Sequence, residues 1–305
     1  MASLSQRQGW SLAVLLAVFP CFLCARAEND SPAITYRTGT SEVRVRFFAT
    51  DENNRVVQTI DRNDFAVVDG DRVIRDFRSL TRSDETNLDI VVLVDTSESV
   101  APRFHAIAEQ VLRLIAHNRS GDDLSIITFS GLRPAVLCTA DCGGTATESK
   151  IRSLSPAGST PLFDSIAFSA RYIADRHTLG VRQVLILLSD GNDTISGTSA
   201  RQALDALIGT GALLYTINPN QSARDLEGGL ALQEMAEATG GRSFSGQDDA
   251  AQILETALAD LHASYVVTYP LPSRTAGFHS LRILPKHNLN LSFHCRRGYF
   301  YDEDR

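Results

Sequence analysis

Apolar residues in the middle of the chain follow two alternating periods. Continuous apolar runs of strand length end in a polar residue, as from Leu88 to Val94, and a segment with helical apolar spacing follows each run. Strands that are apolar throughout are typical of a sheet covered on both faces. The alternation predicts an α/β domain over residues 85–263, with a doubly wound, mostly parallel sheet and right-handed crossovers.

The two kinds of segment follow one another with some regularity. The expected strands cover residues 88–94, 123–129, 181–190 and 212–218, and the expected helices cover residues 100–118, 161–176, 199–208, 230–239 and 250–262.

The two ends of the chain show another pattern. Residues 28–84 and 264–305 contain short segments in which apolar and polar residues alternate, separated by turns such as Asp69-Gly70. Each flank alone is short for a stable core, whereas both together supply enough strands for a sandwich. We therefore predict one β-sandwich-like domain formed by both chain ends, with the α/β domain inserted in it. Two separate flaps packed on the α/β domain are the alternative.

Residues 1–27 are typical of a secretory signal peptide. Arg7 precedes an apolar run from Trp10 to Cys24, and Ala25-Arg26-Ala27 supplies small residues for cleavage. The run is too short, and too closely followed by polar sequence, for a membrane span. A lipoprotein anchor is the alternative, although the residues before Cys21 and Cys24 are poor neighbours for its cleavage. We expect a secreted or periplasmic protein whose mature chain has no membrane span.

Charge limits the kinds of partner. The 305 residues carry a formal net charge of -7, and removal of the signal peptide takes away two arginines and no acid, which gives -9. An acidic surface argues against nucleic acid, which needs clustered Lys and Arg. It is compatible with divalent cations.

Three cysteines remain after residue 27. In an oxidising compartment Cys138 and Cys142 are close enough in sequence to form a disulfide, which contributes roughly 2 kcal/mol by chain entropy. Cys295 is then unpaired. A zinc site at His294 and Cys295 is the alternative, but adjacent strand residues point to opposite faces.

Two apolar runs end in an acid. Asp95 follows the first expected strand and Asp190 follows the third. In parallel α/β sheets, ligands bind outside the carboxyl ends of the strands, so both acids are expected at the same edge.

Three loops at this edge resemble one family. The stretch "DTSES" fits the Asp-x-Ser-x-Ser signature of the von Willebrand factor A fold, while "AGSTPLFD" and "LLSDGND" look like its second and third metal-site loops. The flanking segments "DRNDFAVVDGDRVIRDF" and "GFHSLRI…CRRGYF" are similar to those of secreted bacterial VWFA-related proteins. The resemblance implies the fold and a divalent-metal site, which that family calls MIDAS. It does not imply a biological task.

The resemblance places the metal ligands at Asp95, Ser97, Ser99, Thr160 and Asp190. Mg²⁺ is small and hard and takes six oxygens, and alternating positions in one loop allow three side-chain oxygens to face one point. Three neutral hydroxyls and two carboxylates leave the ion incompletely neutralised. It would then keep an open position for an outside carboxylate. Helix capping by the hydroxyl residues, with two solvated acids, is the alternative.

Other acids lie near these loops. Many members of the family have Gly where this chain has Glu98, which could repel acidic ligands, fill the open position, or let Ca²⁺ or Mn²⁺ compete with Mg²⁺. Asp164 is expected to be a first-turn helix residue, favoured by the helix dipole. Asp193 is expected to be a solvated loop acid.

These features favour a binding protein over an enzyme. The sequence has no Gly-x-Ser-x-Gly elbow, no Gly-x-x-x-x-Gly-Lys-Ser/Thr phosphate loop and no His-Glu-x-x-His motif. We predict an adhesion-type protein that uses the ion to capture an acidic group on an extracytoplasmic protein or glycan. A structural assembly module of the cell envelope, with a metal that does not bridge to a partner, is the alternative.

Overall fold

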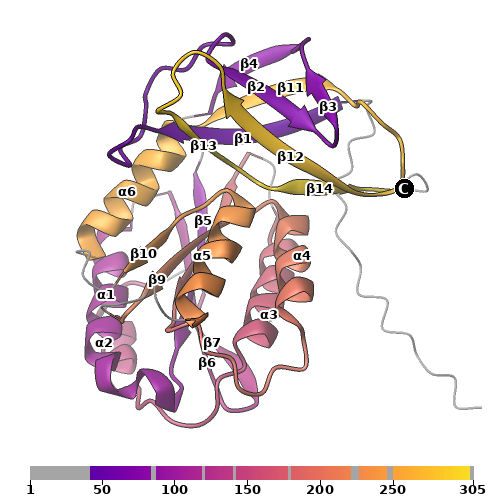
Figure 1. Cartoon of the computed structure of the whole chain (residues 1–305). Helices are drawn as coiled ribbons and strands as arrows, with labels where there is room; N and C mark the ends of the chain where they lie inside the picture. The colour runs from indigo at the N-terminus through magenta and orange to yellow at the C-terminus, as the bar shows by residue number, and fades with distance from the viewer. Residues whose placement is uncertain are drawn as a thin grey trace, which may run out of the picture. The chain divides into compact units, whose positions relative to one another are not determined.

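The computed structural model describes residues 42–83, 87–118, 121–139, 142–177, 180–220, 227–245 and 250–302, which belong to one compact unit. The predicted signal peptide lies outside the described residues. Among the residues that are described, no helix combines the length and the apolar character needed to cross a membrane. Strands form three sheets, and helices accompany the largest of them (Figure 1).

The largest sheet has six strands in the order β10-β9-β8-β5-β6-β7. Its strands are β5 (Leu88–Asp95), β6 (Asp123–Ser130), β7 (Arg133–Cys138), β8 (Arg182–Leu188), β9 (Leu213–Asn218) and β10 (Ser243–Ser245). Every pair is parallel except β6 with β7. Strands β5 and β8 are buried along their whole length, as the apolar runs from Ile90 to Val94 and from Val184 to Leu188 indicate. The predicted α/β fold with a mostly parallel sheet is confirmed.

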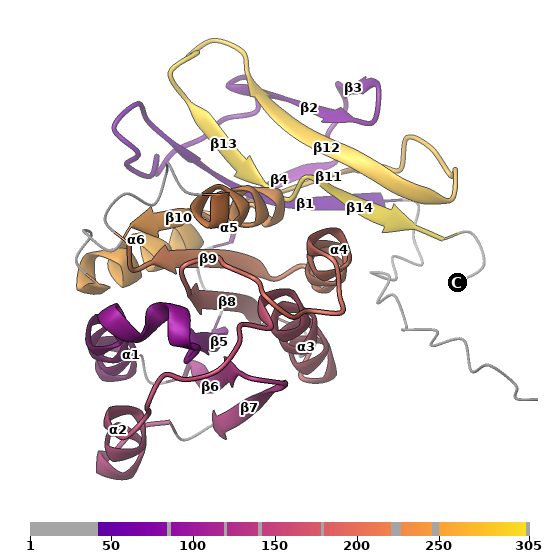
Figure 2. The same cartoon turned by 60° about the horizontal axis from the view of Figure 1, so that its bottom comes forward.

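Helices cover both faces of this sheet (Figure 2). They are α1 (Phe104–His117), α2 (Thr145–Arg152), α3 (Leu162–Asp175), α4 (Ala200–Thr210), α5 (Glu227–Thr239) and α6 (Ala250–His262). One hydrophobic cluster joins α1 and α6 to one face, and a second joins α3, α4 and α5 to the other. The helix predicted over residues 100–118 begins only at Phe104, because a short 3-10 helix, η1 (Glu98–Arg103), contains Pro102 and precedes it.

Three elements had no sequence prediction. Strand β7 is a half-exposed edge strand with Pro134 in it, so it has no continuous apolar run. Helix α2 is polar and buries only Thr147 and Ile151. Strand β10 has three residues. Each element is too short or too exposed to leave a clear periodicity in the sequence.

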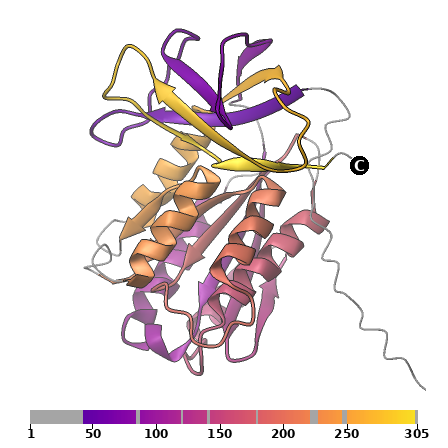
Figure 3. The ribbon, with the colours of Figure 1, turned by 45° about the vertical axis from the view of Figure 1, so that its right-hand side comes forward.

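The two flanks build the other sheets together (Figure 3). One sheet has the order β13-β1-β11-β4, and the other has the order β14-β12-β2-β3. The N-terminal flank supplies β1 (Glu42–Thr50), β2 (Phe65–Asp69), β3 (Arg72–Ile74) and β4 (Ser79–Arg82), and the C-terminal flank supplies β11 (Tyr265–Pro270), β12 (Gly277–Pro285), β13 (Ser292–Cys295) and β14 (Gly298–Tyr301). One hydrophobic cluster contains side chains from both sheets. The β-sandwich-like domain and its boundaries at residues 84/85 and 263/264 stay predictions.

The α/β part meets the flank sheets where the chain leaves and re-enters them. The backbone N–H of Ser83 donates to the carbonyl of Ser264 at 2.8 Å. The buried Arg182, at the start of β8, donates to the Ser83 carbonyl at 2.7 Å and to Ser264 Oγ at 3.1 Å. Burial lowers the pKa of Arg182 to about 9, so its guanidinium is still protonated at neutral pH. The Arg182 guanidinium therefore binds both points at which the chain passes between the flank sheets and the α/β part.

The cysteines occupy two different places. Cys138 and Cys142 form a disulfide with Cα atoms 5.5 Å apart, closing the segment between β7 and α2. Cys295 is free, and it packs against the hydrophobic cluster of the flank sheets. His294 instead stacks on Phe48 with ring centroids 4.6 Å apart. The two neighbours contact different groups, which argues against a shared zinc ion.

His294 predicts a pH dependence of stability. Burial, with a smaller contribution from Arg242, lowers the pKa of His294 to about 4, and its Nε2 lies 3.0 Å from Thr50 Oγ1. The unfolded chain therefore binds more protons between pH 4 and 6.5, so stability is full above 6.5 and falls as the pH falls towards 4. Chemical denaturation should show a loss of about 2 kcal/mol from this residue between pH 7.5 and 5.

The control for this prediction is His294→Gln, which cannot titrate but keeps an amide near Thr50. The variant should have a smaller pH slope than the wild type over the same range. Equal slopes in the two proteins would show that His294 does not carry the effect.

Candidate functional site

A buried carboxylate lies at the carboxyl end of β5, a central strand of the large sheet. Asp95 is the last residue of β5 and is 0% exposed. Its Oδ1 accepts a hydrogen bond from the Ser97 N–H at 2.9 Å, and its Oδ2 accepts one from Ser189 Oγ at 2.7 Å. Burial raises the pKa of Asp95; the bonds from Ser97 and Ser189 oppose this, and the nearby charge of Asp190 adds to it. Two acids thus lie close enough to affect one another in a place shielded from water.

The loop after β5 brings two serine hydroxyls together. Ser97 Oγ and Ser99 Oγ are 3.0 Å apart, as their alternate positions in the sequence predict. Ser97 is buried and Ser99 is exposed. Asp95 and the two serines therefore form a continuous hydrogen-bonded set from the interior to the surface.

The second loop, residues 157–160, leads into α3 and is bound to the first loop. The Ala157 N–H donates to the carbonyl of Thr96 at 2.9 Å, and the Glu98 N–H donates to the carbonyl of Gly158 at 3.0 Å. Thr160 is 1% exposed. These backbone bonds hold Thr160 beside the loop of Asp95 without using its own side chain.

The third loop, residues 189–194, follows β8 and carries Asp190. Asp190 is 6% exposed, and its carboxylate accepts hydrogen bonds from the backbone N–H and the side-chain amide of Asn192, at 3.1 and 2.9 Å. Thr194, further along the same loop, is bonded to Thr160 three times, the longest bond running from Thr194 Oγ1 to the Thr160 carbonyl at 3.5 Å. The Thr160 N–H donates to Thr194 Oγ1 at 2.8 Å, and the Thr194 N–H donates to the Thr160 carbonyl at 2.9 Å.

All three predicted loops are therefore joined by direct hydrogen bonds. We call this surface the site rim and define it as residues 95–99, 157–160 and 189–194. The five predicted ligands within the rim, Asp95, Ser97, Ser99, Thr160 and Asp190, offer side-chain oxygens only, from two carboxylates and three hydroxyls. This donor set suits a hard divalent cation. Within the described ranges, no group of three or more His, Cys, Asp or Glu side chains is arranged to hold a metal ion. A cation here would thus depend on the hydroxyls as well as the acids.

Sequence reasoning missed two hydroxyl residues of the rim. Ser189 donates to the Asp95 carboxylate, and Thr194 holds the backbone of Thr160 on both sides. Both lie inside the quoted motif or directly after it. Their roles depend on contacts between distant strands, so the motif alone gives no signal for them.

The neighbouring acids differ in part from the expectations. Asp193 is not simply solvated: its Oδ1 accepts a hydrogen bond from Ser196 Oγ at 2.5 Å, and it faces the N–H of Phe163 at the start of α3. Asp164 is in the first turn of α3 as expected, and its carboxylate accepts bonds from Gly197 and Thr198. Partial burial raises the pKa of Asp164, but these bonds outweigh it and the pKa is lowered. Both acids hold loops and helices together.

Glu98 lies on the surface of the rim. Its side chain is exposed, and its backbone N–H is one of the two bonds between the first and second loops. An acid at this position leaves the loop geometry intact and adds a negative charge beside the hydroxyls.

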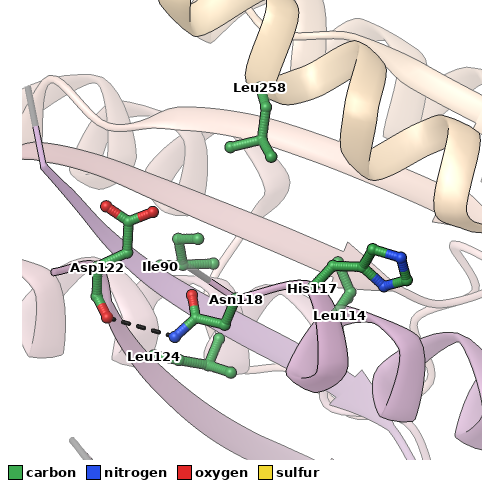
Figure 4. Close-up of a pocket in the computed structure, with 7 residues that line it drawn as sticks. All are labelled: Ile90, Leu114, His117, Asn118, Asp122, Leu124 and Leu258. Carbon is green, nitrogen blue, oxygen red and sulfur yellow. Dashed lines mark hydrogen bonds between the residues drawn. The ribbon is translucent and has the colours of Figure 1, made fainter. Parts of the chain in front are cut away.

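A small pocket lies at the other edge of the large sheet (Figure 4). Ile90 and Leu124, near the starts of β5 and β6, line it together with Leu258 of α6. Asn118 Nδ2 donates to the carbonyl of Asp122 at 3.3 Å at its side. The pocket is at the amino ends of the strands, whereas parallel α/β sheets bind ligands at the carboxyl ends, so we do not assign it to the site.

Comparison with known proteins gives one family. Residues 90–192 match the von Willebrand factor type A domain. A search of the curated proteins found no match.

Several solved structures are similar at low identity. An aerotolerance-related membrane protein from Bacteroides fragilis is 18% identical, with 57% of this chain and 98% of that chain covered and a TM-score of 0.46. A von Willebrand factor type A protein from Catenulispora acidiphila is 16% identical, with coverages of 88% and 65% and a TM-score of 0.47. The manganese-loaded TRAP protein of Plasmodium vivax is 15% identical, with coverages of 76% and 97% and a TM-score of 0.44.

The rim depends on a close backbone contact with α5, which predicts the effect of an added methyl group. A Cβ at Gly228 would lie 2.7 Å from the carbonyl oxygen of Asp190 and 2.9 Å from the carbonyl carbon of Gly191. Gly228→Ala should therefore destabilise the protein by about 1–3 kcal/mol in chemical denaturation, because backbone must move. Gly197→Ala is the matched control, since a Cβ there meets nothing within 4 Å. Equal denaturation midpoints for the two variants would contradict the close contact.

Proposed function

We infer that the chain is an interaction protein that captures an acidic partner through a divalent cation. Support comes from the rim and from the match of residues 90–192 to the von Willebrand factor type A domain. The proposed ligands of the cation are Asp95, Ser97, Ser99, Thr160 and Asp190. The partner would be a protein or glycan outside the cytoplasm, reached by the secretion that residues 1–27 predict.

The observation that carries the proposal is the bonding of three separate loops around two buried acids. Asp95 and Asp190 lie at the carboxyl ends of neighbouring strands, and mutual repulsion contributes to the raised pKa of Asp95. Two buried acids of like charge are costly without a compensating cation. Helix capping, the simpler explanation of the hydroxyls, does not account for this pair. In the described structure Ser97, the residue before η1, makes no side-chain capping bond, and the residue before α3 is Pro161 and not Thr160.

The donor set fits a hard cation. Carboxylate and hydroxyl oxygens suit Mg²⁺, and they also suit Mn²⁺ or Ca²⁺. The two carboxylates formally balance the charge of a divalent ion, but the other three of the five ligands are neutral hydroxyls, which are weak electron donors. The ion would therefore retain affinity for an anionic oxygen of a partner. When bound, it would supply a positive centre on an otherwise acidic surface.

Binding of the metal is the first test of the proposal. Calorimetry should give about one Mg²⁺ or Mn²⁺ per chain for the wild type. Asp95→Asn, which keeps the size of the buried side chain, should weaken binding at least ~tenfold, since even outer partners of a metal site contribute that much. Asp61→Asn removes an exposed acid of the flank and should bind as the wild type does. Binding unaffected by Asp95→Asn would mean that the ion sits elsewhere.

Capture of a partner is the second test. A pull-down from envelope and secreted fractions in Mg²⁺ should retain a partner that EDTA releases. Thr160→Ala should weaken capture without unfolding the chain, because backbone bonds and not its hydroxyl hold its loop. Glu98→Gly should leave capture unchanged or stronger, since it removes an exposed acid that competes with the partner's acid.

The same experiment discriminates the alternative function. A partner retained equally in Mg²⁺ and EDTA, and equally by Thr160→Ala, would make the chain an assembly module of the envelope with a metal that does not bridge. The flank sheets offer a surface for this, because β3, β4, β13 and β14 are edge strands of their sheets.

A further inference from the structure

Two exposed aliphatic side chains flank the loop of Thr160. Leu132 is 86% exposed and Ile195 is 41% exposed. Leu132 has the largest exposed fraction among the large hydrophobic side chains of the described residues. Exposed apolar residues are ordinary when scattered singly, but a pair beside one site needs an explanation.

Hydrogen bonds made by the preceding residues place both side chains close to this loop. The N–H of Gly131, directly before Leu132, donates to the carbonyl of Ser159 at 2.8 Å. The N–H of Thr194, directly before Ile195, donates to the carbonyl of Thr160 at 2.9 Å. Each aliphatic residue is therefore one position away from a backbone bond to Ser159 or Thr160.

Leu132 has no structural reason to be apolar. It occupies a two-residue turn between β6 and β7, in which Ser130 pairs with Arg133 and Gly131 has a φ of 64°. Such hairpin turns need Gly at the first position, and the second position is usually polar. A leucine there exposes its side chain to water, and the turn does not require an apolar residue at this position. We therefore expect the side chain to contact a partner molecule.

Building on the function proposed above, we propose that the partner is a protein, and that it presents an Asp or Glu side chain flanked by apolar residues. The acid would approach the cation while its apolar neighbours cover Leu132 and Ile195. A glycan would fit less well, because sugar rings stack on aromatic side chains and those exposed here are aliphatic. The exposed aromatic among the large hydrophobics of the described residues is Phe278, which belongs to β12.

Random peptides displayed on phage test this inference. The full chain would be panned in Mg²⁺, bound phage would be eluted with EDTA, and magnesium binding by each variant would be measured separately by calorimetry. The eluted pool should be enriched in Asp or Glu with Leu, Ile, Val or Phe beside it. A synthetic peptide from that pool should bind the Leu132→Ser, Ile195→Ser double variant about tenfold more weakly, with Mg²⁺ affinity unchanged.

Val73→Ser is the matched control, since Val73 is 57% exposed in β3 of the flank and should not affect peptide binding. Enrichment of acids without apolar neighbours, or equal binding by the double variant, would overturn the inference and leave the proposed cation-dependent capture standing. Absence of any EDTA-eluted enrichment would overturn the protein partner; if oligogalacturonate is then retained in Mg²⁺, the partner is a glycan and the capture site survives. If Mg²⁺ itself does not bind, the proposed function fails first.

Discussion

The carboxylate of Asp95 is the constraint on which the site depends. A strand buried on both faces ends in an acid that is fully removed from water, so its charge must be compensated by groups fixed nearby. The register of β5 and β8 pairs Val94 with Leu188, which brings Ser189 level with Asp95 and supplies one of its two hydrogen bonds. The order of strands in the sheet thus decides whether this acid is tolerated at all.

The loops of the rim are held together mainly by backbone hydrogen bonds. Backbone bonds hold loops in place without occupying the side chains that would coordinate an ion. In this chain the carbonyls of Thr96, Gly158 and Thr160 accept the bonds between loops. Within the rim, Ser189 supports Asp95 by its hydroxyl and Thr194 supports Thr160 by three bonds. Gly228 of α5 supports the rim by the lack of a side chain. The carboxylates of Asp95 and Asp190 nevertheless accept hydrogen bonds from Ser97, Ser189 and Asn192, so a bound ion would share them with these groups.

The sequence predicted the parts of the fold that repeat a strong pattern. Strands β5 and β8 were evident because burial on both faces favours long apolar runs, although Asp89, Arg182 and Gln183 are buried at the starts of these strands. Asp95 and Asp190 were evident because acids follow those runs. The half-exposed strand β7 and the polar helix α2 were not predicted, since neither has a complete apolar face. The supporting residues of the rim could not be predicted either. Gly228 matters only because the first turn of α5 approaches Gly191, and Ser189 matters only because of the strand register.

The adjacent crossings between the flank sheets and the α/β part have a mechanical consequence. Tension applied between the N-terminal and C-terminal flanks would run through the ladders that join them, β1–β11, β1–β13, β2–β12 and β4–β11, and through the bond from Ser83 to Ser264. Arg182 binds Ser83 and Ser264, the residues at which the chain leaves and re-enters the flank sheets. Because these two points are held together, the force would pass between them and not through the strands of the large sheet. The rim would keep its geometry under a pull on the flanks while those ladders hold, apart from strain passed directly to α5 by the bond from the Arg297 N–H to the Ala238 carbonyl.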